Sequence, residues 1–154
     1  MSYAHRPPPA SGKTTFAHQR LKEDPNLTWV SSDRIRYQLY GNEATQGHWP
    51  TIEATALDQI RQAIAQGQSI LYDATNAKLQ WRKDFLAKAA PLTTAQGIPW
   101  LAWVLLPPVE ICLQRNQQRG RKVPDAAIAL SHASITPQPP TPAEGFLAIH
   151  ILTD

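Results

Sequence analysis

Short apolar runs alternate with longer amphipathic segments along this chain, and this alternation restricts the fold more than any other feature. The apolar runs are LTWVSSD, QSILYDATN, IPWLAWVLLP and FLAIHIL, and the third is apolar at nearly every position. Strands that a parallel sheet buries on both faces have such continuous apolar runs. Segments of about 10 to 15 residues with helical periodicity separate them. The sequence therefore predicts an α/β fold, with a three-layer parallel sheet flanked by helices.

Length and composition indicate one globular domain. A chain of 154 residues with 42% hydrophobic and 18% charged residues can bury one core but is short for two. We therefore expect a single domain over residues 1–154. The net charge of +3 tolerates an anionic ligand but is too small to indicate nucleic-acid binding. No apolar run approaches the roughly 18 residues of a membrane span, and the polar start is not a signal peptide. We expect a cytoplasmic protein without a membrane partner.

The segment PPPASGKT, residues 7–14, matches most of the phosphate-loop pattern G-x-x-x-x-G-K-[ST]. Pro7 occupies the position of the first glycine. Backbone N–H groups of such a loop surround phosphate oxygens at a helix N-terminus, while Lys13 reaches the β and γ phosphates and Thr14 binds Mg²⁺. By chance, GKT at a helix start occurs in roughly one such chain in ten to twenty. The predicted nucleotide-binding residues are Ala10, Ser11, Gly12, Lys13, Thr14, Thr15 and Arg121.

Polar residues follow the next two predicted strands, so they are expected at the carboxyl edge of the sheet. Asp33 can accept a proton from an attacking hydroxyl, and Arg36, one helical turn later, can hold the phosphate of an acceptor. The alternative is an N-cap aspartate and a solvated arginine. After the second strand, Asp73 can hold Mg²⁺ through water, with Asn76 and Arg82 on the substrate. By itself, that segment can equally be a turn with an Asx cap.

Three arginines, Arg115, Arg119 and Arg121, stand at the end of a predicted helix in RNQQRGRKVP. Residues 115–123 can form a lid that places positive charge on a transferring phosphoryl group. The alternative is a solvated basic helix end that complements the helix dipole. Residues 136–145 form a proline-rich loop.

Other reactive residue types give weaker signals. The five histidines show no metal-ligand spacing and Cys112 is the single cysteine, so we predict no transition metal. Cys112, on a predicted helix, is interpreted as a small core hydrophobe. Most of the five tryptophans are interleaved with core residues. Trp49 is left open between packing and base stacking.

Taken together and in this order, PPASGKTT, WVSSDRIRYQLYG, ILYDATNAKLQWRKDFL and RNQQRGRKVP resemble the polynucleotide-kinase-like P-loop kinases. This group has AAA-type ATP-binding domains and is related to zeta-toxin kinases. The resemblance covers about residues 7 to 146. It implies the P-loop NTPase kinase type of sheet, and ATP and Mg²⁺ as cofactors.

The resemblance also implies a reaction. The γ-phosphate of ATP would pass to a hydroxyl, with Lys13 and Thr14 on the nucleotide, Asp33 as general base and Arg36 on the acceptor. Arg115 and Arg119 would close over the phosphates. The expected acceptor is a polynucleotide 5′-hydroxyl. A kinase for a small phosphorylated acceptor and a degenerate ATP-binding module without turnover stay open as alternatives.

Two departures from the family pattern lie at the start of the chain. In the family a buried apolar strand precedes the phosphate loop, whereas here only MSYAHR precedes Pro7. We therefore expect the first central strand to be missing, through a start placed too late or a truncated gene. A proline also fixes φ near about −65°, where the first loop glycine serves a tight turn. We expect the substitution to weaken phosphate binding.

Overall fold

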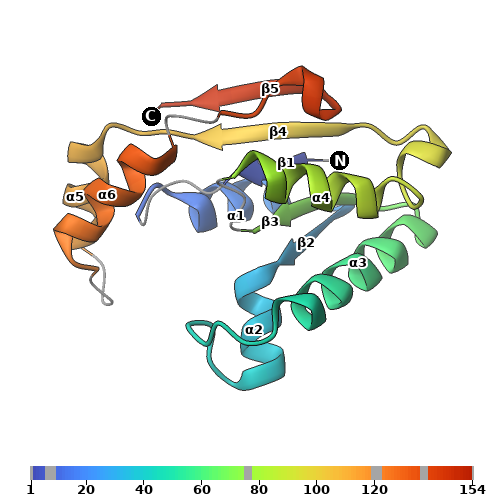
Figure 1. Ribbon diagram of the computed structural model, residues 1–154, viewed down its shortest axis with the longest axis horizontal. Helices are drawn as coiled ribbons and strands as arrows, with labels where there is room; N and C mark the ends of the chain where they lie inside the picture. The colour runs from blue at the N-terminus through green and yellow to red at the C-terminus, as the bar shows by residue number, and fades with distance from the viewer. Residues whose placement is uncertain (1, 6–9, 75–77, 119–122, 136–138, 154) are drawn as a thin grey trace.

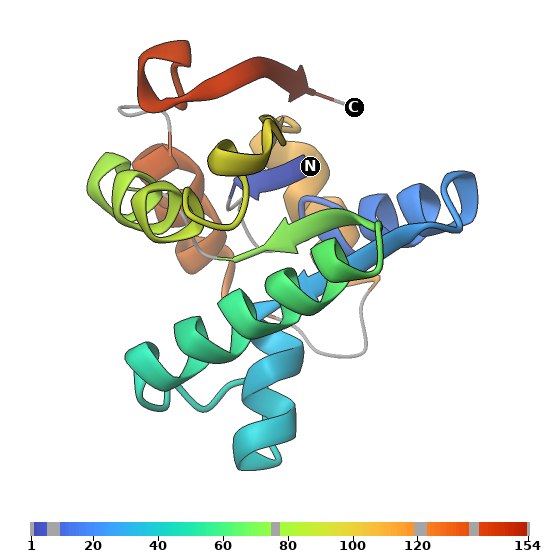
Figure 2. The same ribbon diagram turned by 90° about the vertical axis from the view of Figure 1, so that its right-hand side faces the viewer.

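A computed structural model describes residues 2–5, 10–74, 78–118, 123–135 and 139–153. Within them, five parallel strands form one sheet in the order β2-β3-β1-β4-β5, with helices on both of its faces (Figures 1 and 2). The predicted α/β class, a three-layer parallel sheet flanked by helices, is confirmed.

From α1 onward, helices and strands follow one another as the sequence predicts, with two short 3₁₀ segments in addition. The strands are β1 (Ser2–His5), β2 (Leu27–Ser31), β3 (Ser69–Asp73), β4 (Trp100–Leu105) and β5 (Phe146–Leu152). The helices are α1 (Lys13–Glu23), α2 (Ser32–Tyr40), α3 (Trp49–Ala65), α4 (Leu79–Ala89), α5 (Val109–Gln117) and α6 (Asp125–Ile135), and the 3₁₀ segments are η1 (Thr94–Gln96) and η2 (Pro142–Glu144).

The first central strand, which the sequence predicts to be missing, is present as β1. Ser2 is in register with Leu71 of β3 and Leu101 of β4, so β1 lies between these two strands. A strand depends on its neighbours as much as on its own composition, and here both edges find hydrogen-bonding partners. Four residues therefore suffice at a place where the sequence looked unsuitable. As the middle strand of the parallel sheet, β1 ends at the carboxyl edge between β3 and β4.

Apolar side chains from α3, α4 and the sheet form the main core on one face. Phe85 of α4 stacks on Tyr72 of β3 with ring centres 4.0 Å apart, and it meets Trp100 of β4 edge-on. On the other face, Phe16 of α1 packs against Trp103 of β4, with ring centres 5.4 Å apart. The buried hydrophobic cluster consists of Val30, Ile35, Ile52, Ala56, Ile60, Ala63, Ile70, Tyr72, Ala74, Phe85, Ala89, Trp100, Ala102 and Phe146.

Cys112 of α5 is fully buried, which confirms its interpretation as a core hydrophobe. Burial raises the pKa of its thiol, and the nearby Arg115 opposes this shift only in part. None of the helices in the described ranges is long and apolar enough to span a bilayer.

Candidate functional site

The loop that leads from β1 into α1 ends in left-handed backbone. Ala10 has φ of 66° and Gly12, the N-cap of α1, has φ of 98°. No side chain caps this helix, and its first turn contains no acidic residue. The first N–H groups of a helix have no partner within the helix, so this end of α1 offers donors and positive dipole potential to an anion. Lys13, Thr14 and Thr15 form that first turn. Thr14 is exposed.

Ala10 is the one non-glycine residue with positive φ among the residues described. A left-handed conformation costs an L-residue about 1–2 kcal/mol, and glycine adopts it without that cost. The sequence drew attention to Pro7, which lies outside the described residues. The strain that the structure does show is three residues later, at Ala10.

Lys13 and Asp73, both predicted as site residues, contact each other. The ammonium nitrogen of Lys13 lies 3.2 Å from Oδ1 of Asp73. Asp73 ends β3, the strand adjacent to β1, and is only 7% exposed. A buried carboxylate needs a charged or hydrogen-bonding partner, and Lys13 supplies it here. The parallel sheet thus brings together two residues that are 60 positions apart.

Asp33 and Arg36 form a second charged pair at the start of α2. This helix begins directly after β2, and the hydroxyl of Ser31 accepts the N–H of Arg34 at 3.5 Å as its N-cap. Asp33 lies in the first turn, where the helix dipole favours a carboxylate. Nη1 of Arg36 donates to Oδ1 of Asp33 at 2.9 Å. About half of the Asp33 side chain is exposed (52%), so a hydroxyl can approach it.

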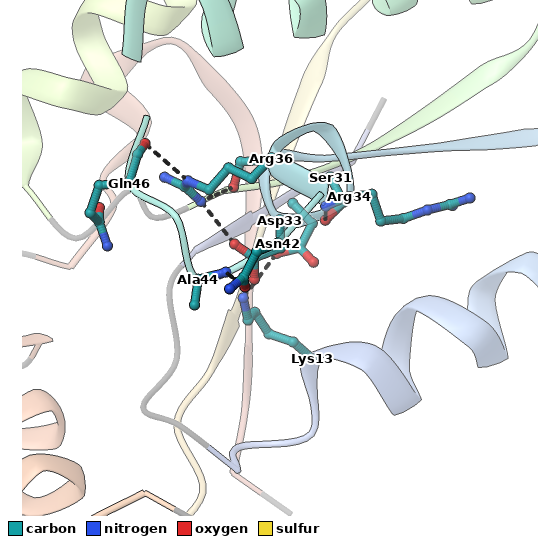
Figure 3. Close-up of polar contacts among 10 residues, drawn as sticks. Lys13, Ser31, Asp33, Arg34, Arg36, Asn42, Ala44 and Gln46 are labelled. Atoms are coloured by element: carbon teal, nitrogen blue, oxygen red, sulfur yellow. Dashed lines mark hydrogen bonds and ion pairs between the residues drawn. The ribbon is translucent and has the colours of Figure 1, made fainter. Parts of the chain in front are cut away.

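Further contacts hold Arg36 in place, as Figure 3 shows. Nη1 of Arg36 lies 3.4 Å from the hydroxyl of Ser32, and its Nε donates to the carbonyl oxygen of Gln46 at 3.5 Å. The residue is only 8% exposed. A guanidinium fixed from several sides is preorganised for an anion that reaches its remaining donors. The contact with Gln46 had no signal in the sequence, because it crosses the loop between α2 and α3.

Arg115 of α5 lies against the phosphate-loop segment. Its Nη1 donates to the carbonyl oxygen of Ser11 at 3.1 Å. The same nitrogen would be 3.4 Å from a Cβ added at Gly12, which is van der Waals contact without a collision, so it is the positive φ of Gly12 that favours glycine there. The structure therefore places Arg115 beside the loop, whereas its closure over phosphates stays a prediction. The other two lid arginines, Arg119 and Arg121, lie outside the described residues, as does Asn76.

Arg82 does not serve as the free substrate contact that the sequence predicts. Its side chain is fully buried and paired with Glu144 of η2, with Nε 2.6 Å and Nη2 2.9 Å from the two carboxylate oxygens. Nη2 also lies 3.4 Å from the carbonyl oxygen of Pro139. Burial of a guanidinium requires such complete pairing. The arginine joins α4 to the segment before β5.

The charged groups meet at the carboxyl edge of neighbouring strands. Asp33 follows β2, Asp73 ends β3 and the Lys13 loop follows β1, and these three strands are adjacent in the sheet. Figure 3 shows Lys13 and the Asp33–Arg36 pair directed into the same region. Ligands of open parallel sheets bind at this edge. The arrangement combines an anion site with a carboxylate and an arginine that can serve a second reactant.

Comparisons with known proteins agree with this fold. The family model described as AAA domain matches residues 8–138. Comparison with curated protein sequences gives no match. A chain from "Structure of the Pnkp1/Rnl/Hen1 RNA repair complex" superposes with a TM-score of 0.71 at 20% identity, covering 88% of this chain and 43% of that one.

Other solved structures share the fold at similarly low identity. A fungal RNA kinase superposes with a TM-score of 0.67 at 14% identity, covering 99% of this chain and 38% of that one. A sugar kinase from Janibacter sp. HTCC2649 gives 0.61 at 20% identity, with 99% and 84% covered. The chain thus spans less than half of the two RNA-related chains but most of the sugar kinase. The predicted resemblance to P-loop kinases is confirmed at the level of family and fold.

Proposed function

Because the chain belongs to the AAA domain family and has the fold of P-loop kinases, we propose that it transfers the γ-phosphate of ATP to a hydroxyl, with a polynucleotide 5′-hydroxyl as acceptor. One observation carries the proposal. The Asp33–Arg36 pair follows β2, and the Lys13–Asp73 pair joins the first residue of α1 to the end of β3, the strand next to β2. A phosphate donor and a hydroxyl acceptor therefore have separate charged residues at one edge.

The nucleotide phosphates would bind at the N-terminus of α1. Backbone N–H groups from Ala10 to Thr15 would donate to the phosphate oxygens. The ammonium of Lys13 would leave Asp73 and bind phosphate oxygens instead. Arg115, already at the loop, and Arg119 and Arg121 would add positive charge over the phosphates.

The oxygen donors at this site fit Mg²⁺. Thr14 presents an exposed hydroxyl in the first turn of α1, and Asp73 presents a carboxylate at the end of β3. Thr14 would hold the ion directly, and Asp73 would do so through water. When bound, Mg²⁺ neutralises phosphate charge during the transfer.

Two residues of α2, Asp33 and Arg36, would act on the acceptor. Asp33 takes the proton of the attacking hydroxyl, whose oxygen forms a bond to the γ-phosphorus as the bond to the β–γ bridging oxygen breaks and ADP leaves. Arg36 holds a phosphate of the acceptor, so that the hydroxyl stays near Asp33. These two roles fit the environment of each residue: Asp33 is exposed and can reach a hydroxyl, and Arg36 is held in a fixed position.

One specific observation favours each of two other functions. A small-molecule kinase fits the superposition on the sugar kinase, of which the chain covers the larger share. A nucleotide-binding module without turnover fits the strained Ala10 in the phosphate loop.

A panel of acceptors distinguishes the three functions. Purified protein with γ-labelled Mg-ATP would be offered a 5′-hydroxyl oligonucleotide, nucleosides and sugars, with Lys13→Ala as control. We expect label on the oligonucleotide, and none with the control. Label on a nucleoside or sugar alone would assign a small-molecule kinase. Binding of ATP without transfer to any acceptor would assign the inactive module.

A further inference from the structure

Arg36 also lies beside an aromatic ring to which the proposed reaction gives no role. Its guanidinium carbon is 5.9 Å from the centre of the Trp49 ring, at the first residue of α3. Trp49 is 37% exposed, although its neighbour Arg36 is almost buried. One arginine thus links the carboxylate of Asp33 to a partly open indole. The indole offers an apolar surface next to the residues proposed to hold the acceptor.

The segment that carries the indole is held against α2. The backbone N–H of His48 donates to the Tyr40 hydroxyl at 3.1 Å, and the carbonyl of Gln46 accepts from Arg36. A Cβ added at Gly47 would lie 2.3 Å from Cε2 of Tyr40, so the backbone runs directly against that ring. These contacts fix the start of α3 relative to Arg36. Because this segment is already held in place, a ligand that binds there loses little binding free energy to the entropy cost of ordering a loop.

We propose that Trp49 is the stacking platform for the first base of a nucleic-acid acceptor. The inference rests on the proposed function and specifies the acceptor class at that same site. Asp33, Arg36 and Trp49 match the three parts of a 5′-terminal segment: its hydroxyl, its first phosphate and its base. Aromatic side chains stack on bases without regard to sequence, and a base with no pairing partner is free to stack. The site therefore fits a single-stranded 5′ end.

A sugar or other acceptor without a planar ring would gain little at this position. Base stacking on an aromatic side chain strengthens binding by about 5- to 150-fold. The same indole also contacts Arg36, so its removal can disturb the arginine as well. A test must therefore separate stacking on the acceptor from support of Arg36.

Binding of two oligonucleotides makes that separation without requiring turnover. Each carries a 5′-hydroxyl and a 3′ fluorophore, and one lacks the base of its first nucleotide. Anisotropy titrations compare wild type, Trp49→Ala, Trp49→Phe and the control Trp81→Ala. Trp81 is similarly exposed, at 44%, but its ring lies 4.9 Å from the Lys78 ammonium instead of beside Arg36.

We expect the wild type to bind the base-bearing strand at least about 5-fold more tightly than the abasic strand. Trp49→Ala should remove this preference, Trp49→Phe should retain part of it, and Trp81→Ala should leave it unchanged. The inference is overturned if Trp49→Ala weakens both strands equally, or if Trp81→Ala removes the preference. Base-dependent binding without label transfer would keep the inference and refute the proposed reaction. Label transfer that is unchanged in Trp49→Ala, without base-dependent binding, would keep the proposed reaction and refute the inference.

Discussion

The buried ion pair between Arg82 and Glu144 gives the most quantitative prediction from this structure. Both side chains are almost completely inaccessible, with 0% and 1% exposure. Glu144→Gln removes the negative charge and leaves the guanidinium buried. Breaking a buried pair in this way costs about 3–5 kcal/mol, against a total of about 5–15 kcal/mol for an ordinary domain. We expect the variant to lose roughly a fifth or more of its free energy of unfolding.

Urea unfolding followed by tryptophan fluorescence measures this loss. The double variant Arg82→Met with Glu144→Leu should be less destabilised than the sum of the two single changes, because no unpaired charge stays buried. The control Arg61→Met breaks the exposed pair with Asp58 and should leave the midpoint almost unchanged. If Glu144→Gln keeps the wild-type midpoint while Arg82→Met abolishes transfer to the acceptor, Arg82 contacts substrate and our structural interpretation is refuted.

Three further changes have directions set by local geometry. Ala10→Gly should raise the free energy of unfolding by up to about 1 kcal/mol, because relief of the left-handed strain exceeds the added entropy of the unfolded chain; a lower urea midpoint would contradict this. Gly47→Ala should weaken oligonucleotide binding and spare ATP binding, since its Cβ would collide with Tyr40; titrations with each ligand decide. Burial raises the pKa of the Cys112 thiol, so iodoacetamide at pH near 8 should label it only after unfolding; rapid labelling of native protein would be the contrary result.

The parts of the fold that the sequence predicts are those with local signals. The continuous apolar run in β4 and the helical spacing in α3 identify their elements without reference to the rest of the chain. The β1 strand was missed because its place depends on β3 and β4, which supply hydrogen bonds on both edges. Backbone pairing across a sheet leaves no trace in a four-residue sequence.

The residues of the candidate site also divide into those with a local signal in the sequence and those whose role depends on distant residues. Lys13 was predicted from the GKT part of the phosphate-loop pattern. Asp33 and Asp73 were predicted because each follows or ends a strand, and parallel strands bring such positions to one edge. Arg82 was misinterpreted because its partner Glu144 is 62 residues away, so nothing near it in sequence marks the arginine as buried. The contact of Arg36 with Trp49 was missed for a similar reason, since a loop separates the two.

The central claim is that Asp33 acts on the acceptor hydroxyl while nucleotide binding belongs to the loop. Single-turnover transfer of label from γ-labelled Mg-ATP to a 5′-hydroxyl oligonucleotide, in wild type and Asp33→Asn, tests it most directly, with ATP affinity measured in parallel. Loss of a general base should slow transfer by about 10²- to 10⁴-fold and leave ATP affinity unchanged. Equal transfer rates in the two proteins, or a matching loss of ATP affinity, would contradict the assignment of Asp33.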